Sequence, residues 1–435
     1  MSKIIEPKIL KGFRDFLPAV EIERKRVIRL LEDNFESYGF VPIDTPALEY
    51  TEVLLGKGSG ETDKQMYRFE DNGKRDVAMR FDLTIPFARF MAKNRQDLYL
   101  PFKRYHINKV WRGENTQRGR YREFTQCDFD IVGTDCASAD FEILTMMRSS
   151  LSALDVPNCT IHLSHRGIFN RFLDHLGIKE QSVEILRTVD KLAKIGRDEV
   201  LRLLTELSDA EKAEMILDYI QKEDGFIPTL EKLERLAGGP AEDSGRLREI
   251  WSFICELGLE DGFVLNPSIT RGLDYYTGIV YETFLDDLPG IGSVCSGGRY
   301  NNLAGLYTKE SLPGVGSSIG LDRLMAGLEE LGRSAARSSN TQVMIMNLEK
   351  DLVGYYHGLA DRFRKAGFCC EVYHDTKKFG PQFKFAEAKG IPLAVICGGN
   401  EKEAGTVNLK DMRNRESYEG ISPEDALKKA EELLK

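Results

Sequence analysis

The sequence predicts an α+β protein with three parts: a core built on an antiparallel sheet, a helical insertion within that core, and a C-terminal α/β domain. Three observations lead to this fold class. Strand-like runs separated by turn residues cluster between residues 77 and 133. Residues 179–262 are charged and follow the period of helices. Residues 341–435 alternate strand and helix patterns, which is typical of a small sheet with parallel strands.

Length and composition agree with this architecture and exclude several classes of protein. The 435 residues correspond to about three domains, and 42% hydrophobic with 30% charged residues is an ordinary globular balance. No apolar run approaches the roughly 18 residues of a membrane span, and we find no apolar signal segment at the N-terminus. Eight cysteines without a Cys-x-x-Cys pair argue against a disulfide framework and against a zinc ribbon. We therefore expect a reduced, cytoplasmic protein.

The first part of the core, residues 1–178, begins with a predicted helix. Apolar residues recur at helical spacing up to Gly39, a natural helix C-cap: Ile28, Leu31, Phe35 and Tyr38. Val41–Glu49 follows as an extended segment punctuated by two prolines. Ile85–Lys93 is the one helical stretch among the strand-like runs.

The core resumes after the insertion. Strand signals return in GFVLN, GIVYETFL and GSVCS, and GVGSSIG followed by LDRLMAGLEELG forms a strand–turn–helix unit. We therefore delimit the insertion as residues 179–262 and the second part of the core as residues 263–332. A polar linker, residues 333–340, then leads into the C-terminal domain, residues 341–435.

The net charge of −9 speaks against a chain that binds nucleic acid over its whole surface. The distribution of the charge changes this conclusion. The insertion holds 12 basic and 20 acidic residues, whereas Lys103–Phe124 holds seven Lys or Arg against two Glu. Because salt screens charges beyond about 10 Å, phosphates respond to such a local basic patch rather than to the net charge.

The most informative stretch is residues 109–133, a predicted hairpin with a long polar loop from Gly113 to Tyr121. Strand alternation places one row of its second strand on a single face: Arg122, Phe124, Gln126, Asp128 and Asp130. Two interpretations of this row stay open. It is either the solvated side of an antiparallel sheet, or a concave face that grips a small polar cation while Arg112 and the loop arginines hold phosphates.

Two further stretches combine charged residues with glycines. In TRGLDYYTGIVYE, Tyr275 and Tyr276 are either packing residues or functional side chains at a turn that enters a strand. GVGSSIG lacks the third glycine of a dinucleotide fingerprint, so we interpret it as a strand that delivers Arg323 to a helix N-terminus, where anions bind. No P-loop motif is present in the sequence. His162 and His165 lack a nearby carboxylate or thiolate, so we expect no resident metal ion there.

Together these stretches resemble the class II aminoacyl-tRNA synthetases, and specifically the histidyl-tRNA synthetases. Three of them are similar to motifs 1, 2 and 3 of the class: GFVPIDTPALE (39–49), WRGE…RYREFTQCDFD (111–130) and GVGSSIGLDRL (314–324). Two resemble signatures of the histidine enzymes: RGLDYY (271–276) and GGRY (297–300). MRFDLTIPFAR (79–89) resembles the strand and helix that hold the amino group of the amino acid.

The resemblance implies a class II synthetase core, an anticodon-binding domain over residues 341–435, and a homodimer whose interface contains motif 1 with Pro46. It also implies a reaction. L-Histidine and ATP condense to histidyl-adenylate and pyrophosphate, and the histidyl group then moves to the terminal ribose of tRNA(His). Mg²⁺ is expected to bridge the outer phosphates of ATP.

The resemblance also assigns roles to single residues. For L-histidine it implies contacts with Asp82, Leu83, Thr84, Arg112, Gln126, Asp130, Arg271, Tyr275 and Tyr276. For ATP it implies contacts with Arg112, Glu114, Arg120, Phe124 and Arg323, with Phe124 stacked on the adenine ring. Arg112 and Arg271 are the implied catalytic residues. In these enzymes the counterpart of Arg271 lies near the α-phosphate, where a fixed guanidinium stabilises the charge that adenylation builds.

Three qualifications accompany this interpretation. The acidic insertion is expected to touch RNA only through a basic edge: Arg187, Lys191, Lys194 and Arg197. A non-catalytic relative is the alternative function, either a histidine-sensing regulatory subunit of ATP phosphoribosyltransferase or a sensor of uncharged tRNA. Such chains typically erode RGLDYY or lack the final domain, and this chain keeps both. Glycyl, prolyl and threonyl synthetases lack the Arg271 signature.

Overall fold

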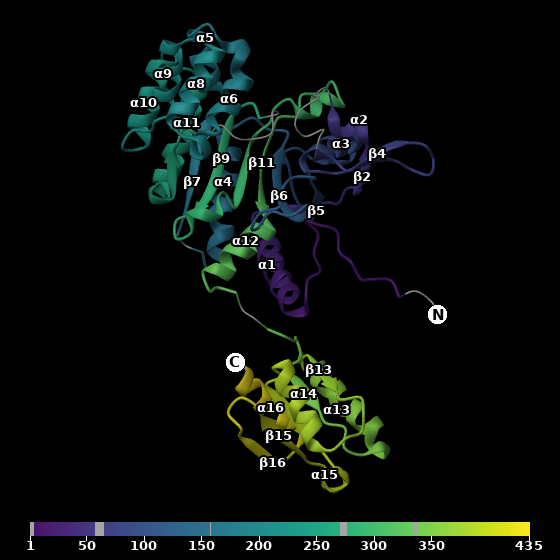
Figure 1. Cartoon of the computed structure of the whole chain (residues 1–435). Coiled ribbons are helices and arrows are strands. Elements are labelled where there is room, and N and C mark those ends of the chain that lie inside the picture. The colour runs from purple at the N-terminus through teal and green to yellow at the C-terminus, as the bar shows by residue number, and fades with distance from the viewer. Residues whose placement is uncertain (1–3, 57–64, 157, 270–275, 335–336) are drawn as a thin grey trace. The chain divides into compact units, whose positions relative to one another are not determined.

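The computed structural model describes residues 4–56, 65–156, 158–269, 276–334 and 337–435 (Figure 1). The chain folds into two compact units. The first comprises residues up to Arg14 together with Val27–Ser334, and the second comprises Asp15–Arg26 together with Ala335–Lys435.

A large, mostly antiparallel sheet organises the first unit. Its strands, in their order across the sheet, are β1 (Val41–Pro42), β5 (Phe102–Trp111), β6 (Glu123–Val132), β11 (Gly314–Gly320), β10 (Cys295–Arg299), β9 (Ile279–Leu285), β7 (Cys159–His165) and β8 (Phe263–Leu265). The six central strands pair antiparallel, as predicted. The short edge strands β1 and β8 pair in parallel, which was not predicted. Both reach their partners through long connections, as parallel pairs require.

Helices cover the apolar face of this sheet. They are α1 (Pro18–Ser37), α4 (Ala137–Ala153) and α12 (Leu321–Glu330). Leu31 and Phe35 of α1 are fully buried in one cluster with Cys127, Phe129 and Ile131 of β6. Because side chains alternate along a strand, Gln126, Asp128 and Asp130 lie on the opposite face. That polar face carries the site described below.

A second, three-stranded sheet lies beside the large one. It consists of β2 (Leu48–Tyr50), β4 (Asp76–Met79) and β3 (Arg68–Glu70), with α2 (Thr51–Leu55) and α3 (Thr84–Asn94) next to it (Figure 1). The helix predicted over 85–93 is therefore present as α3. The pairing of β4 with β2 and β3 is antiparallel, as predicted for the strand runs of this region, but the separate sheet that they form was not predicted. A strand's period does not identify its partner.

The chain between β7 and β8 is helical, and it includes α5 ahead of residues 179–262, the range predicted as a helical insertion. Its helices are α5 (Arg166–His175), α6 (Ser182–Val189), α7 (Leu192–Ile195), α8 (Arg197–Leu207), α9 (Ala210–Tyr219), α10 (Phe226–Leu236) and α11 (Glu242–Glu256). Figure 1 shows most of them gathered in teal at one end of the sheet, next to β7 and β9. Their buried apolar residues belong to the same cluster as the core of the sheet.

The second unit has a five-stranded sheet with its own apolar core. Its strands lie in the order β13 (Cys370–Val372), β12 (Val343–Ile345), β14 (Leu393–Ile396), β15 (Val407–Asp411) and β16 (Ser417–Ile421), with helices α13 (Val353–Lys365), α14 (Phe379–Lys389), α15 (Gly399–Ala404) and α16 (Pro423–Leu434). The predicted parallel pairing holds for β12, β13 and β14. It is wrong for β15, which pairs antiparallel with β14. The strand β16 was not predicted, and it pairs antiparallel with β15. A short turn joins β15 to β16, and such a turn permits only an antiparallel pair.

No helix among the described residues combines the length and the apolar character that crossing a bilayer requires.

Candidate active site

Two adjoining cavities open on the polar face of the large sheet, and each has a volume of about 250 Å³. We call them the Asp82 cavity and the Phe124 cavity. The Asp82 cavity is lined by Asp82, Thr84, Arg112, Gln126, Asp130, Tyr276, Tyr281, Glu282, Ser296, Gly297, Tyr300, Gly316, Ser317 and Ser318. The Phe124 cavity is lined by Arg112, Glu114, Gly119, Arg120, Tyr121, Phe124, Gln126, Glu282, Ser293, Val294, Ser296, Ser318, Gly320, Asp322 and Arg323.

A buried carboxylate stands at one end of the Asp82 cavity. Asp82 directly precedes α3, and its Oδ1 accepts a hydrogen bond of 3.2 Å from the backbone N–H of Ile85. Its Oδ2 has no hydrogen-bond partner among the residues that the structure describes. Burial raises the pKa of Asp82 to about 6. A cationic ligand group at Oδ2 would satisfy this oxygen and stabilise the ionised form.

Asp130 is held in the floor of the same cavity by two groups. Arg104 of β5 places Nη2 2.7 Å from Oδ2 of Asp130, and Tyr300 donates a hydrogen bond from its hydroxyl to Oδ1. Burial raises the pKa of Asp130. The arginine also lies over the ring of Phe87, 4.0 Å from its centroid. Asp130 is therefore fixed in position from two sides, by Arg104 of the neighbouring strand β5 and by Tyr300, which follows β10.

Gln126 lies where the two cavities meet. Its Nε2 donates to Ser318 Oγ at 2.9 Å, and its Oε1 has no hydrogen-bond partner among the described residues. Ser318 faces Asp128 across the β6–β11 pair, and Gly316 faces Asp130. A Cβ at Gly316 would stand 1.9 Å from Asp130 Oδ1, so only glycine leaves room for that carboxylate.

The Phe124 cavity combines an aromatic face with three arginines. The Arg112 guanidinium lies 5.2 Å from the centroid of the Phe124 ring. Arg112 Nε donates to the carbonyl of Phe81 at 2.8 Å, which orients the guanidinium between the two cavities. Arg323, in the first turn of α12, donates to the carbonyl of Ser293 at 2.6 Å. A flat ring flanked by fixed guanidinium groups fits a planar base that carries phosphates.

The loop of the β5–β6 hairpin reaches the first turn of α12. A Cβ at Gly119, whose φ is +69°, would stand 3.2 Å from Cα of Arg323. Asp322 fixes the start of this helix, because it accepts from the backbone N–H of Thr125 at 2.8 Å and pairs with Arg14. The predicted strand that delivers Arg323 to the start of a helix is present, since β11 leads directly into α12.

Most of the predicted site residues line these cavities. Asp82, Thr84, Arg112, Gln126, Asp130 and Tyr276 line the Asp82 cavity, and Arg112, Glu114, Arg120, Phe124 and Arg323 line the Phe124 cavity. Leu83 has a fully buried side chain and lines neither cavity. Arg271 and Tyr275 lie outside the described residues.

The polar row of β6 is not a solvated face. Gln126, Asp128 and Asp130 are at most 9% exposed, so the interpretation as the outer side of a sheet is wrong. Sequence reasoning did not assign roles to other lining residues: Tyr281, Glu282, Ser296, Tyr300 and Ser318. Glu282 lines both cavities. Glu282 is the charged residue inside the apolar run IVYETFL, and this position could have indicated a functional role for it.

A third cavity of about 840 Å³ adjoins the Phe124 cavity. The hairpin-loop residues Gln117, Arg118 and Arg120 line it together with Val189 and Asp190 of the insertion. This volume lies within the range of small-molecule sites, near its upper end.

The described residues contain no group of three or more His, Cys, Asp or Glu side chains arranged to hold a metal ion. His162 Nδ1 lies 2.9 Å from the amide nitrogen of Asn266, and His165 caps α5 by accepting from the backbone N–H of Gly167. These contacts give both histidines structural roles.

Comparison with known proteins agrees with the geometry. A family model described as histidyl-tRNA synthetase matches residues 12–324, and one described as an anticodon binding domain matches residues 342–433. A histidine–tRNA ligase of Treponema denticola is 54% identical over 429 residues, covering 95% of this chain and 96% of that protein. A histidine–tRNA ligase of Rhodopirellula baltica is 47% identical over 422 residues, covering 96% of each.

Solved structures are similar over the whole length. The histidyl-tRNA synthetase of Nostoc sp. has a TM-score of 0.87 at 31% identity and covers 99% of this chain and 100% of that one. A Bacillus halodurans structure titled as an ATP phosphoribosyltransferase regulatory subunit/histidyl-tRNA synthetase shares the fold, with a TM-score of 0.76 at 19% identity over 91% of this chain and 99% of that one. With a family model that spans most of its length, the chain belongs to the histidyl-tRNA synthetase family.

Proposed function

We propose that this chain is a histidine–tRNA ligase. It activates L-histidine with ATP to form histidyl-adenylate and pyrophosphate, and it then transfers histidine to the terminal ribose of tRNA(His). The observation that carries the proposal is the pair of adjoining cavities, one lined by buried carboxylates and one by an aromatic ring with arginines. Arg112 lines both cavities, as a group at the junction of an amino acid and a nucleotide should.

We assign the Asp82 cavity to L-histidine. The unpartnered Oδ2 of Asp82 suits the α-ammonium group, with Thr84 beside it. Asp130, Gln126 and Tyr276 surround the imidazole ring. A pocket that forms hydrogen bonds with both ring nitrogens rejects amino acids whose side chains lack matching donors and acceptors. Binding such an amino acid would leave buried polar groups of the pocket without hydrogen bonds. Leu83 would contribute through its backbone, and Tyr275 remains a proposed neighbour of the ring.

We assign the Phe124 cavity to ATP. Phe124 would stack on adenine, Glu114 would meet the adenine edge, and Arg120 with Arg323 would meet the distal phosphates. Arg112 would hold the α-phosphate and the histidine carboxylate. Arg271 is proposed to stabilise the charge that develops on the α-phosphoryl oxygens as the carboxylate displaces pyrophosphate.

The residues of the ATP end fit a Mg²⁺ ion that arrives with the nucleotide. Mg²⁺ prefers oxygen ligands and keeps several phosphate or water ligands, so it does not need a cage of protein carboxylates. Glu282, which lines both cavities, is a carboxylate that we place beside the proposed phosphate path. Mg²⁺ would neutralise part of the phosphate charge, while the arginines orient the nucleotide.

We propose that tRNA(His) meets both units. The second unit would bind the anticodon, as its family description implies. The third cavity, between the hairpin loop and the insertion, would admit the acceptor end. The insertion would contribute only its basic edge, Arg187, Lys191, Lys194 and Arg197, because the rest of its surface is acidic.

We further propose a homodimer in the cytoplasm. Val41, Leu48, Tyr50 and Phe69 are each about half exposed beside Pro46, which is unusual for apolar residues on or near strand edges and is typical of a buried interface. Sedimentation of an active monomer at micromolar concentration would contradict the dimer. All eight cysteines are free, which suits a reducing compartment.

ATP–pyrophosphate exchange across the twenty amino acids tests the proposal. Exchange that depends on histidine alone, followed by charging of tRNA(His), is expected. Exchange with another amino acid would contradict the substrate assignment, and no exchange with any amino acid would favour the non-catalytic alternative.

A further inference from the structure

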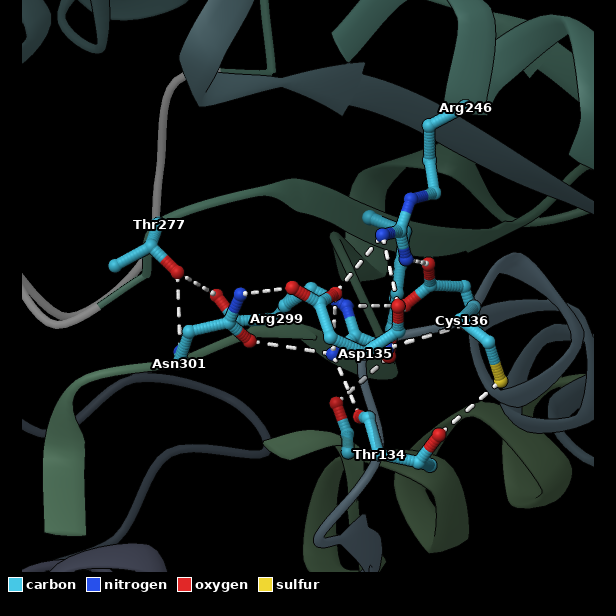
Figure 2. A network of polar contacts seen from close by, with 10 residues as sticks. Thr134, Asp135, Cys136, Arg246, Thr277, Arg299 and Asn301 are labelled. Atoms are coloured by element: carbon cyan, nitrogen blue, oxygen red, sulfur yellow. Dashed lines mark hydrogen bonds and ion pairs between the residues drawn. The ribbon is translucent and has the colours of Figure 1, made fainter. Parts of the chain in front are cut away.

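A network of charged and polar side chains surrounds Arg299 at the end of β10 (Figure 2). It draws on three separate parts of the chain. Asp140 lies in the first turn of α4 and Asp135 just before that helix, Arg299 lies at the end of β10, and Arg246 lies on α11 of the helical insertion. Asn301 follows β10 and completes the set. None of these residues lines either substrate cavity.

The two arginines share the two carboxylates. Arg246 donates to Asp140 Oδ2 at 3.0 Å and to Asp135 Oδ1 at 2.9 Å. Arg299 donates to Asp140 Oδ1 at 2.8 Å and lies 3.2 Å from Asp135 Oδ1. Asp140 is completely buried, and Arg299 is nearly so. The network is therefore neutral only while both arginines are present.

The network continues to the segment that carries Tyr276. Asn301 Nδ2 donates to Asp135 Oδ2 at 3.0 Å, and the backbone N–H of Asn301 donates to the hydroxyl of Thr277 at 3.0 Å. The backbone N–H of Thr277 donates to the carbonyl of Arg299 at 2.7 Å. Figure 2 shows Asn301 between Thr277 and Asp135, and Arg246 extending from its helix toward Asp135.

Thr277 and Gly278 are thus held on the end of β10. A Cβ at Gly278 would stand 3.2 Å from the Arg299 side chain, and a Cβ at Gly298 would stand 2.9 Å from the ring of Tyr276. Tyr276, the residue before Thr277, lines the Asp82 cavity. A shift of Arg299 or Asn301 would therefore be transmitted to a side chain at the substrate.

A contribution to the stability of the fold does not by itself explain why the protein has this network of buried charges. Replacing a buried ion pair with packed apolar side chains is often neutral or stabilising, because the desolvation of the charges offsets their attraction. Burial raises the pKa of Asp140, and the two arginines oppose that effect. What the network supplies, and apolar packing does not, is a fixed position for Thr277 relative to the insertion.

We propose that Arg246 is a positioning residue for histidine, which acts through Asp135, Asn301 and Thr277 to place Tyr276, so that the insertion and the histidine end of the site are coupled. This inference rests on the proposed function. Arg246 touches no substrate in this account. Its contribution is to the geometry of the pocket, so it affects the affinity for histidine more than the affinity for ATP.

Arg246→Met, which keeps the length of the side chain and removes its charge, tests the coupling. In histidine-dependent pyrophosphate exchange, we expect the KM for histidine to rise about tenfold, within the 5–150-fold range of coupled sites. The KM for ATP should change by no more than about twofold. Arg246→Lys should recover part of the affinity, because an ammonium group still reaches one carboxylate.

Arg248→Met is the matched control. Arg248 lies on the same helix and pairs with Glu234 of α10 at 2.6 Å, so its ion pair stays within the insertion. The Arg248→Met variant should leave the KM for histidine unchanged. It should lower thermal stability by as much as Arg246→Met does, or by less. An equal rise of the KM for histidine in both variants would overturn the proposal, since it would indicate general loosening of the insertion.

Asn301→Ala and Thr277→Val give a second test if Arg246→Met folds poorly. Asn301→Ala removes the hydrogen bond to Asp135, and Thr277→Val removes the hydroxyl that accepts from the backbone N–H of Asn301. Each variant should therefore raise the KM for histidine. The double variant Arg246→Met/Thr277→Val should show less than the product of the two single effects, because both substitutions interrupt one path. If the two substitutions raised the KM for histidine multiplicatively in the double variant, the coupling would be overturned. The same holds if the variants kept the wild-type KM for histidine and only the number of active sites fell. An inactive wild-type protein would instead refute the proposed function.

Discussion

Burial sets the ionisation of the carboxylates beneath the two cavities. It raises the pKa of Asp82 to about 6 and that of Asp128 to about 7, although the guanidinium of Arg104 acts in the opposite direction on both. Asp128 lies between Gln126 and Asp130 on β6 and lines neither cavity. Two buried carboxyl groups, those of Asp82 and Asp128, therefore take up a proton at a higher pH than an ordinary aspartate does.

Asp128→Asn should reveal this titration in the stability of the first unit. A raised pKa in the folded state means that stability is present below the ordinary value of about 4 and is lost as the pH rises through about 7. Relative to wild type, the variant should become more stable between pH 5 and pH 8. Urea unfolding followed by tryptophan fluorescence measures it, since Trp111 and Trp251 both belong to the first unit. A difference that does not change with pH would contradict the raised pKa.

Arg271 is the residue on which the proposed chemistry depends most. If it stabilises charge only as the adenylate forms, Arg271→His should lower kcat for activation by on the order of 10²–10³, the range for loss of one preorganised donor. Arg271→Lys should also fail, because an ammonium group lacks the planar fork. Single-turnover assays separate activation from transfer. A variant that mainly weakens ATP binding would show that Arg271 only binds the nucleotide.

Strand period and residue type could predict much of the site, but not all of it. The alternation along β6 correctly places Phe124, Gln126 and Asp130 on one face. Tyr300 and Glu282 come from strands far along the chain, and only the order of strands in the sheet brings them to the cavity. Local patterns in a single sequence do not reveal the order of strands in the sheet.

At the scale of elements, β11 approaches β6 closely and β10 approaches β11 closely, because glycines occupy positions where a Cβ would collide. Gly316 leaves room for Asp130, and a Cβ at Gly297 would stand 2.1 Å from the carbonyl oxygen of Gly316. That carbonyl also accepts a hydrogen bond of 2.8 Å from the hydroxyl of Tyr281. The glycines in these strands thus create the space in which the Asp82 cavity lies.

Gly316→Ala should displace the Asp130 carboxylate and weaken histidine binding. We expect the KM for histidine to rise at least tenfold in pyrophosphate exchange, with a smaller change in the KM for ATP, because Gly316 lines only the Asp82 cavity. Gly305→Ala is the control, since no atom lies within 4 Å of a Cβ at that position. Normal histidine affinity in Gly316→Ala would show that Asp130 is not tightly placed.

The elements themselves follow their local patterns well. The helix that ends before Gly39, the β5–β6 hairpin and α3 all occur where apolar spacing and turn residues predict them. The small sheet formed by β2, β4 and β3 and the antiparallel strand β16 were not predicted. Partners in a sheet depend on contacts between distant segments, which local periodicity does not determine.

At the scale of the molecule, two units have separate apolar cores. Leu393 is fully buried in the core of the second unit. Leu393→Ala should therefore destabilise that unit by about 2–5 kcal/mol, the range for such truncations. Calorimetry should show a lowered transition, whereas the tryptophan-detected transition of the first unit should not move. A matching shift of both transitions would contradict independent unfolding.

The central claim is that the Asp82 cavity holds histidine and the Phe124 cavity holds ATP. Initial rates of pyrophosphate exchange, with each substrate varied, test it in Tyr276→Phe and Phe124→Ala. Loss of the tyrosine hydroxyl should raise the KM for histidine about 5- to 30-fold, and loss of the stacking ring should raise the KM for ATP about 5- to 150-fold. Each variant should leave the other KM within about twofold. Equal effects on both substrates in either variant would contradict the division of the site.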